Sequence, residues 1–98
     1  MTRQVSLSVN GVTITLDSFV EEFTERTVRG MVAALKGAGE VETADIIISG
    51  DKVTININGD SVPTNLFASK IIKSTIEGLV APLKGVSEIS SLTINISR

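Results

Sequence analysis

The chain has 98 residues, of which 42% are hydrophobic and only 3% aromatic, and its formal net charge is −2. A chain of this length is too short for two independent cores, so we expect a single domain over residues 1–98. Cysteine and histidine are both absent, which excludes a disulfide framework, a thiolate nucleophile and the usual zinc sites.

The first predicted element is a strand. From Val5 to Val9, apolar and small polar residues alternate, which is typical of a strand with one buried face. Asn10-Gly11 follows, and this dipeptide favours a type I′ turn because both residues tolerate positive φ. The alternation resumes over residues 12–16. Whether these residues return as a second hairpin strand stays open.

A helix is predicted over residues 18–36. Asp17 is a good N-cap, while Ser18 with Glu21 three residues later offers a competing capping box. The helix is expected to end at Lys36, since Gly37 suits the left-handed position after a helix. A strand rich in β-branched residues follows over residues 44–49.

The second half of the chain repeats the first. Shifted by 48 positions, residues 5–49 align with residues 53–97 without a gap, and 15 of the 45 pairs are identical, whereas unrelated chains match at roughly 6% of positions. Residues 1–49 and 50–98 are therefore interpreted as two repeats. The same elements are expected again, namely a strand over 53–57, an Asn-Gly turn, a helix over 66–84 that begins after Asn65, and a closing strand over 92–97.

These elements predict an α+β fold. Gly50-Asp51 is short enough only for a hairpin between the halves, so the order becomes βαβ-βαβ, which is typical of a ferredoxin-like antiparallel sheet with two helices on one face. In that arrangement the first strands of the two halves lie in the middle and the closing strands at the edges. A pair of tandem ββαβ units is the alternative, although Pro63 weakens the second hairpin.

Three aromatic and two glycine positions carry predictions about packing. Phe19, Phe23 and Phe67 are expected in the interior, because few other large side chains are available. Gly30 and Gly78 fall in mid-helix, where glycine costs on the order of 1 kcal/mol relative to alanine. Close packing is the simplest reason for them, and it predicts that Gly30→Leu or Gly78→Leu destabilises the protein by several kcal/mol.

Exposed and charged positions supply the candidate interaction residues. The charges of the first helix, Glu25 and Arg29 among them, are interpreted as a solvated face with favourable i,i+4 spacings. The matching positions of the second helix have diverged in charge, so an acidic and a basic helix could meet a neighbouring molecule. They are Ser69, Lys70, Lys73, Ser74 and Glu77. Strand alternation also turns one isoleucine away from the helices. The candidate interaction residues are Ile47, Lys70, Lys73, Glu22 and Arg26, and no catalytic, cofactor-binding or metal-ligating residue is predicted.

The order of elements resembles ferredoxin-like regulatory modules such as the ACT domain. Acylphosphatases and small metal chaperones are excluded, because the chain has no Gly-rich phosphate loop before the first helix and no Cys-x-x-Cys loop. A string in the second half, repeated over residues 17–37, resembles a unit of small uncharacterised archaeal proteins from methanogens. It consists of Asn65, Phe67, Ile71, Ile76, Gly78, Leu79, Leu83, Lys84 and Gly85. This resemblance carries no activity with it.

The expected function is that of a non-enzymatic interaction or regulatory module, self-associating as a homodimer or larger through its closing strands, without a cofactor. The alternative is an ACT-like sensor of a small polar metabolite, bound at the helix starts or between subunits. Nucleic-acid binding through Lys70, Lys73 and Lys84 is a weaker option, because the chain is slightly acidic and offers no aromatic residue on the open sheet face. A cytoplasmic location is expected, since neither a membrane-spanning run nor a secretory signal is found.

Overall fold

The computed structural model describes residues 4–36, 41–83, 86 and 88–97. The elements follow one another as β1 (Gln4–Val9), β2 (Val12–Ile14), α1 (Ser18–Lys36), β3 (Thr43–Ser49), β4 (Lys52–Ile57), β5 (Asp60–Ser61), α2 (Leu66–Val80) and β6 (Ser91–Ser97). This α+β order is the tandem ββαβ alternative, because both Asn-Gly segments return as short hairpin strands. The expected helix-ending glycines Gly37 and Gly85, like Lys84, lie outside the described residues.

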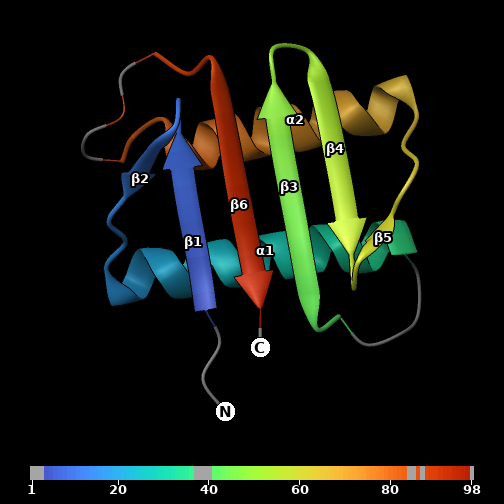
Figure 1. Cartoon of the computed structure of the whole chain (residues 1–98), viewed down its shortest axis with the longest axis horizontal. Coiled ribbons are helices and arrows are strands. Elements are labelled where there is room, and N and C mark those ends of the chain that lie inside the picture. The colour runs from blue at the N-terminus through green and yellow to red at the C-terminus, as the bar shows by residue number, and fades with distance from the viewer. Residues whose placement is uncertain (1–3, 37–40, 84–85, 87, 98) are drawn as a thin grey trace.

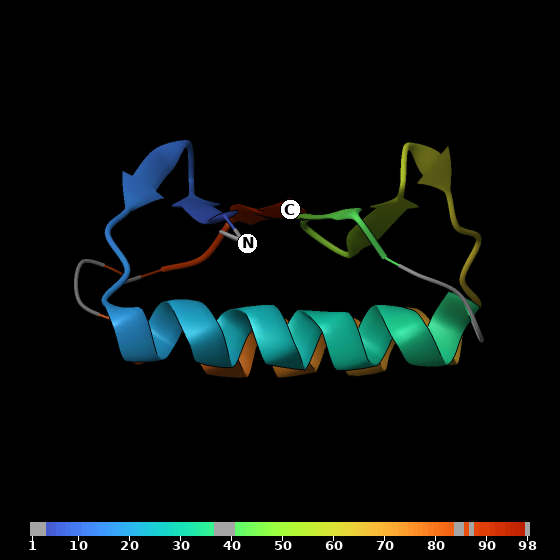
Figure 2. The same ribbon diagram turned by 90° about the horizontal axis from the view of Figure 1, so that it is seen from below.

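The six strands form one antiparallel sheet in the order β2-β1-β6-β3-β4-β5. Both helices run across the same face of this sheet, and the two outer hairpins rise away from them (Figures 1 and 2). The predicted placement of the first strands in the middle is wrong, because the closing strands β3 and β6 are the central neighbours. The reason is local: β2 occupies one edge of β1, and β5 occupies one edge of β4. Each first strand therefore has only one edge left for pairing with another long strand, whereas the central ferredoxin-like position requires two.

The pairing register interlocks the two halves. Strand β1 pairs with β6, and β4 pairs with β3, so each first strand lies beside the closing strand of the other half. Val5 is opposite Ile96, and the corresponding Val53 is opposite Ile48. At the centre of the sheet, Ile46 is opposite Ile94. The two halves therefore share one sheet.

The Asn-Gly turns have the predicted conformation. Asn10 and Asn58 have φ values of 53° and 52°, and the glycines after them are also at positive φ, as a type I′ turn requires. The side-chain oxygen of each asparagine also accepts two backbone N–H bonds at the start of the other half's closing strand. The donors lie 2.7 and 3.0 Å away for Asn10, from Ser90 and Ser91, and 2.7 and 3.1 Å away for Asn58, from Glu42 and Thr43.

The predicted N-caps of both helices are confirmed. The side-chain oxygens of Asp17 and Asn65 accept a bond from the backbone N–H three residues later, at 2.8 and 2.7 Å. Helix α1 ends where predicted, whereas α2 ends at Val80, four residues before the predicted end. Pro82 explains the difference, since it has no N–H to continue the helical hydrogen bonds, and the last of these bonds is donated by Ala81 to the carbonyl oxygen of Glu77.

The core lies between the sheet and the helices and is almost entirely aliphatic. Its residues are Leu7, Val9, Ile14, Val28, Val32, Val41, Ala44, Ile46, Ile48, Ile55, Ile57, Ile72, Ile76, Val80, Leu92, Ile94 and Ile96. The prediction that the phenylalanines belong to this core is wrong, because all three are exposed. Val28 and Val32 define the inward side of α1. Phe19 lies nine residues before Val28, about two and a half turns away, and so points outward.

The two mid-helix glycines are also on the outside. A Cβ atom added to Gly30 or Gly78 would meet no atom within 4 Å. The close-packing interpretation is therefore wrong, and Gly30→Leu is no longer expected to destabilise the chain by overpacking. The physical reason is the orientation of the helices, which turn these positions away from the sheet.

We now expect Gly30→Ala to stabilise the folded chain. Alanine restricts the unfolded backbone and favours the helix by about 1 kcal/mol relative to glycine, and no neighbour opposes its methyl group. Urea unfolding at a protein concentration low enough to keep the chain monomeric measures the change, with Gly78→Ala as the matched variant. A loss of stability in both variants would show that these glycines pack against the chain itself.

Thr24 is a buried polar residue in the middle of this apolar layer. Its side chain is 0% exposed, and its hydroxyl has no hydrogen-bond partner in the part of the chain that is described. The corresponding residue of the second half is Ile72, a buried aliphatic side chain. We therefore expect Thr24→Val to raise the free energy of unfolding by about 1–2 kcal/mol, because a buried unpaired hydroxyl is costly. Thermal unfolding measures this, and the exposed Thr43→Val is the control, expected near zero.

Candidate functional site

No other described element covers the side of the two helices that points away from the sheet (Figure 2). In each helix, residues at spacings i, i+4, i+7, i+11 and i+14 share one side, and all of them are exposed. We call this set the outer helix face. It consists of Phe19, Phe23, Arg26, Gly30 and Ala33 on α1, of Phe67, Ile71, Ser74 and Gly78 on α2, and of Ala81, which caps the end of α2.

The large apolar side chains of this face occupy corresponding positions in the two halves. Phe19 and Phe67 are 73% and 72% exposed, while Phe23 and Ile71 are 52% and 48% exposed. The rings of Phe19 and Phe23 lie side by side, with centroids 5.9 Å apart. In both helices the large residues occupy the first half and glycine and alanine the second. Because α1 and α2 run in opposite directions (Figure 2), the bulky half of each helix lies beside the small half of the other.

Sequence reasoning missed this face because it placed the phenylalanines inside. The signal was nevertheless present in helical periodicity: Val28 and Val32 form an aliphatic pair at i,i+4, and so do Ile72 and Ile76. A projection centred on those pairs puts the phenylalanines on the opposite side. Such exposed apolar side chains, gathered on one face, are typical of an interaction surface.

The structure brings Glu22 and Arg26 together on α1. Arg26 Nη2 lies 2.6 Å from Glu22 Oε1, with both side chains largely exposed. The pair lines a shallow hollow of about 200 Å³ with Phe19 and Phe23. Arg26 is the only charged residue in the set that defines the outer helix face.

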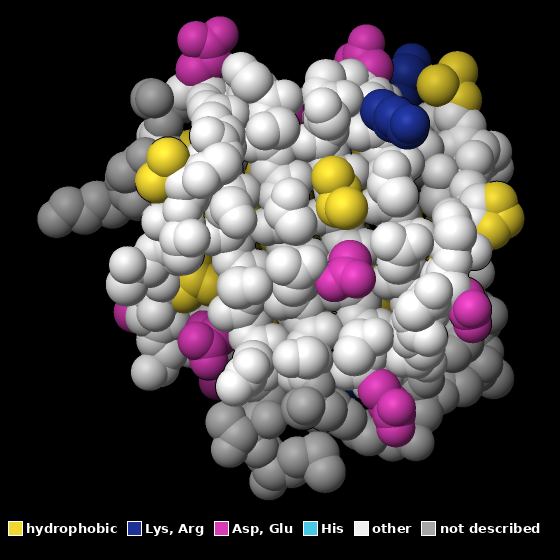
Figure 3. Space-filling model, viewed as in Figure 1, with side chains coloured by type: hydrophobic (Ala, Val, Ile, Leu, Met, Phe, Trp, Pro, Cys, Tyr) yellow, Lys and Arg dark blue, Asp and Glu magenta, His cyan; other side chains and the backbone are white. Residues whose placement is uncertain are grey.

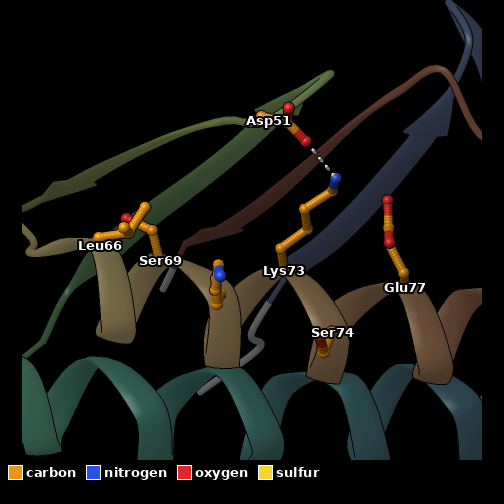
Figure 4. Close-up of a pocket in the computed structure, with 7 residues that line it drawn as sticks. Asp51, Leu66, Ser69, Lys73, Ser74 and Glu77 are labelled. Carbon is orange, nitrogen blue, oxygen red and sulfur yellow. Dashed lines mark hydrogen bonds and ion pairs between the residues drawn. The ribbon is translucent and has the colours of Figure 1, made fainter.

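Lys70 and Lys73 line one hollow beside α2, and Lys73 extends from the helix toward the β3–β4 turn (Figure 4). Lys73 Nζ lies 3.1 Å from Asp51 Oδ1 in that turn. Around them is a hollow of about 380 Å³, which we call the α2 hollow. It is lined by Asp51, Leu66, Ser69, Lys70, Lys73, Ser74 and Glu77. A site of this composition could hold a small molecule that carries both an anionic and a cationic group.

Ile47 lies elsewhere, on the open face of the sheet. The prediction that it points away from the helices is confirmed, since it is 38% exposed while Ile46 and Ile48 are buried. Its neighbours across the sheet are Thr54 and Thr93, and most of this face is polar and uncharged (Figure 3). The five predicted interaction residues thus lie in three separate places.

The solvated-face interpretation is wrong for Glu25, which is only 4% exposed. Glu25 lies three residues before Val28 and therefore on the inward side of α1. Its Oε1 atom is 2.5 Å from Arg29 Nε, and Arg29 Nη1 donates to the carbonyl oxygen of Val41 at 2.9 Å. The pair thus ties α1 to the residues that lead into β3.

Other functional classes receive no support from the described residues. Within them, no group of three or more acidic side chains could hold a metal ion. Neither described helix is long and apolar enough to cross a membrane. No protein-family model, curated protein or solved structure matches the chain.

Proposed function

We propose that this protein is a non-enzymatic interaction module that associates with a second copy through its outer helix face. The observation that carries the proposal is the exposure of Phe19, Phe23, Phe67 and Ile71 at corresponding positions of the two helices. Each phenylalanine can bury on the order of 150 Å² or more in a contact. A face with aromatic residues, an arginine and few other charges has the composition of an interface core.

Association through the sheet edges is disfavoured. The closing strands, whose low charge first suggested edge pairing, are central in the sheet. The edges are β2 and β5, with three and two residues. Edges this short offer little backbone for pairing with another chain. The helix face is therefore the better route.

We predict a dimer at micromolar concentration, converted to a monomer by combining Phe23→Ser with Ile71→Ser. Both side chains are exposed, so their loss removes intermolecular contacts without opening the core. Sedimentation equilibrium measures the mass, and Val12→Ser, which removes an exposed apolar residue at the sheet edge, is the control expected to remain dimeric. A wild-type mass that stays near 10.3 kDa at all concentrations would overturn the proposal.

We also propose that the two halves arose by internal duplication. The identities at a spacing of 48 residues support this, and so do the shared turn φ values and N-caps. A further support is the register, since Ile46 and Ile94, which are corresponding residues, lie opposite each other. This is the relation expected at an approximate two-fold axis.

A second candidate function is the sensing of a small polar metabolite. The α2 hollow favours it, because its volume of about 380 Å³ falls in the range of small-ligand sites and it begins at the start of α2. A thermal-shift screen against amino acids and other small zwitterions tests it, since a specific ligand stabilises the folded state. Shifts that persist in a Lys70→Ala, Lys73→Ala variant would argue against this hollow. Nucleic-acid binding is less favoured, because Asp51 and Glu77 offset the two lysines.

A further inference from the structure

We infer that two copies stack helix layer on helix layer, so that α1 faces α1 and α2 faces α2 of the second copy, each pair antiparallel. This inference rests on the proposed self-association and specifies its geometry. The two-fold axis lies in the interface plane, perpendicular to the helices. Such an interface is isologous and closes at two copies.

Shape complementarity is the first support. Phe19 and Phe23 occupy the first half of the outer helix face of α1, while Gly30 and Ala33 occupy its second half. Antiparallel pairing sets the bulky half of one helix against the small half of its partner. The same relation holds for α2, with Phe67 and Ile71 opposite Gly78 and Ala81. Two copies can therefore approach closely along both helices.

The exposed glycines gain a role in this arrangement. Glycine disfavours the helix at Gly30 and Gly78, and open space above both shows that no contact within the described chain requires its small size. A facing aromatic ring would need that space. The contact that explains these two residues is therefore intermolecular.

Charge decides between the two ways of stacking the helix layers. Among the charges nearest the outer helix face, Glu22 precedes Arg26 along α1 and Lys70 precedes Glu77 along α2. Lys73 is not one of them, because it pairs with Asp51 on the flank of α2. When each helix faces its own copy in antiparallel fashion, opposite charges lie near each other. If α1 faced α2 instead, Glu77 would lie near Glu22, and Lys70 would have no acidic residue of the outer helix face near it. Like-charge contacts of that kind suppress the wrong partner.

The size of the face is sufficient for a specific dimer. At 1.5 Å per residue the helices are about 28 and 22 Å long, and each is about 10 Å wide. Side by side they present roughly 500 Å² per copy, or roughly 1,000 Å² over two copies, which is the lower limit for a specific interface.

The first test places large side chains at Gly30 and Gly78, in the half of each helix that carries small residues. Gly30→Trp with Gly78→Trp is expected to weaken dimerisation about 100-fold or more, while circular dichroism shows an intact fold because neither position has a neighbour within 4 Å. Asn95→Trp, on the open sheet face, is the matched control and stays dimeric. If the wild type is a dimer and the double variant dimerises equally well, the stacking is wrong although self-association stands. If the wild type is a monomer, both fail.

The second test uses the absence of native cysteine. In the first mixture, one chain carries Phe23→Cys and the other carries Gly30→Cys, and mild oxidation should link them by a 23–30 disulfide. In the second mixture, Phe23→Cys is combined with Gly78→Cys, and the 23–78 disulfide should form more slowly. Faster formation of 23–78 would assign the rival stacking of α1 on α2. Formation of neither would overturn the helix-on-helix arrangement.

Discussion

Ile46→Ala is expected to lower the free energy of unfolding by about 3–5 kcal/mol, enough to unfold much of a marginally stable domain of this size. Ile46 is 0% exposed and lies on the central strand β3, opposite Ile94 on the central strand β6. A truncation there leaves a cavity between strands that are held on both edges and cannot collapse easily. Urea unfolding monitored by circular dichroism measures the loss.

The neighbouring residue provides the control. Ile47 is on the same strand but 38% exposed on the open sheet face, so Ile47→Ala should cost less than about 1 kcal/mol. Ile94→Ala, the corresponding core residue, should resemble Ile46→Ala. Equal losses for Ile46→Ala and Ile47→Ala would contradict the assignment of the two faces of the sheet.

Asn58→Ala should cost about 2–5 kcal/mol, although the residue is exposed. The variant loses two hydrogen bonds that Asn58 accepts at the start of β3, from the backbone N–H groups of Glu42 and Thr43, each contributing about 0.5–1.5 kcal/mol. It also places alanine at a φ of 52°, where a side chain without a local hydrogen bond adds about 1–2 kcal/mol of strain. Thermal unfolding provides the measurement.

Asn58→Gly separates the two contributions. Glycine adopts the positive φ without strain but has no side-chain oxygen to accept the two hydrogen bonds. The free energy of unfolding of Asn58→Gly should therefore exceed that of Asn58→Ala by the strain energy alone. Asn10→Ala should behave like Asn58→Ala, since its oxygen makes the corresponding pair of bonds. Asn95→Ala serves as a neutral control on the open sheet face. A negligible effect of Asn58→Ala would show that the turn is held by the hairpin alone.

Local sequence determined the turns of this protein and the starts of its helices. The Asn-Gly turns, the N-caps Asp17 and Asn65 and the start of both helices follow from the preferences of a few adjacent residues, and all of them agree with the structure. The aliphatic residues of both closing strands were likewise predicted to alternate between two faces. These features could be predicted because each depends on contacts within a few residues of the chain.

Tertiary structure decided which edges and faces those elements present. The order of strands depends on pairing between residues far apart in sequence, and the short return strands β2 and β5 settled it by occupying one edge of β1 and of β4. The packing of α1 against the sheet likewise determined which side of the helix faces inward. As a result, Glu25 and Thr24 are buried, and Phe19 and Phe23 are exposed. Composition alone indicated the reverse for most of these residues. Residue type sets the cost of burial, but the position of a side chain relative to the sheet determines which side chains are buried.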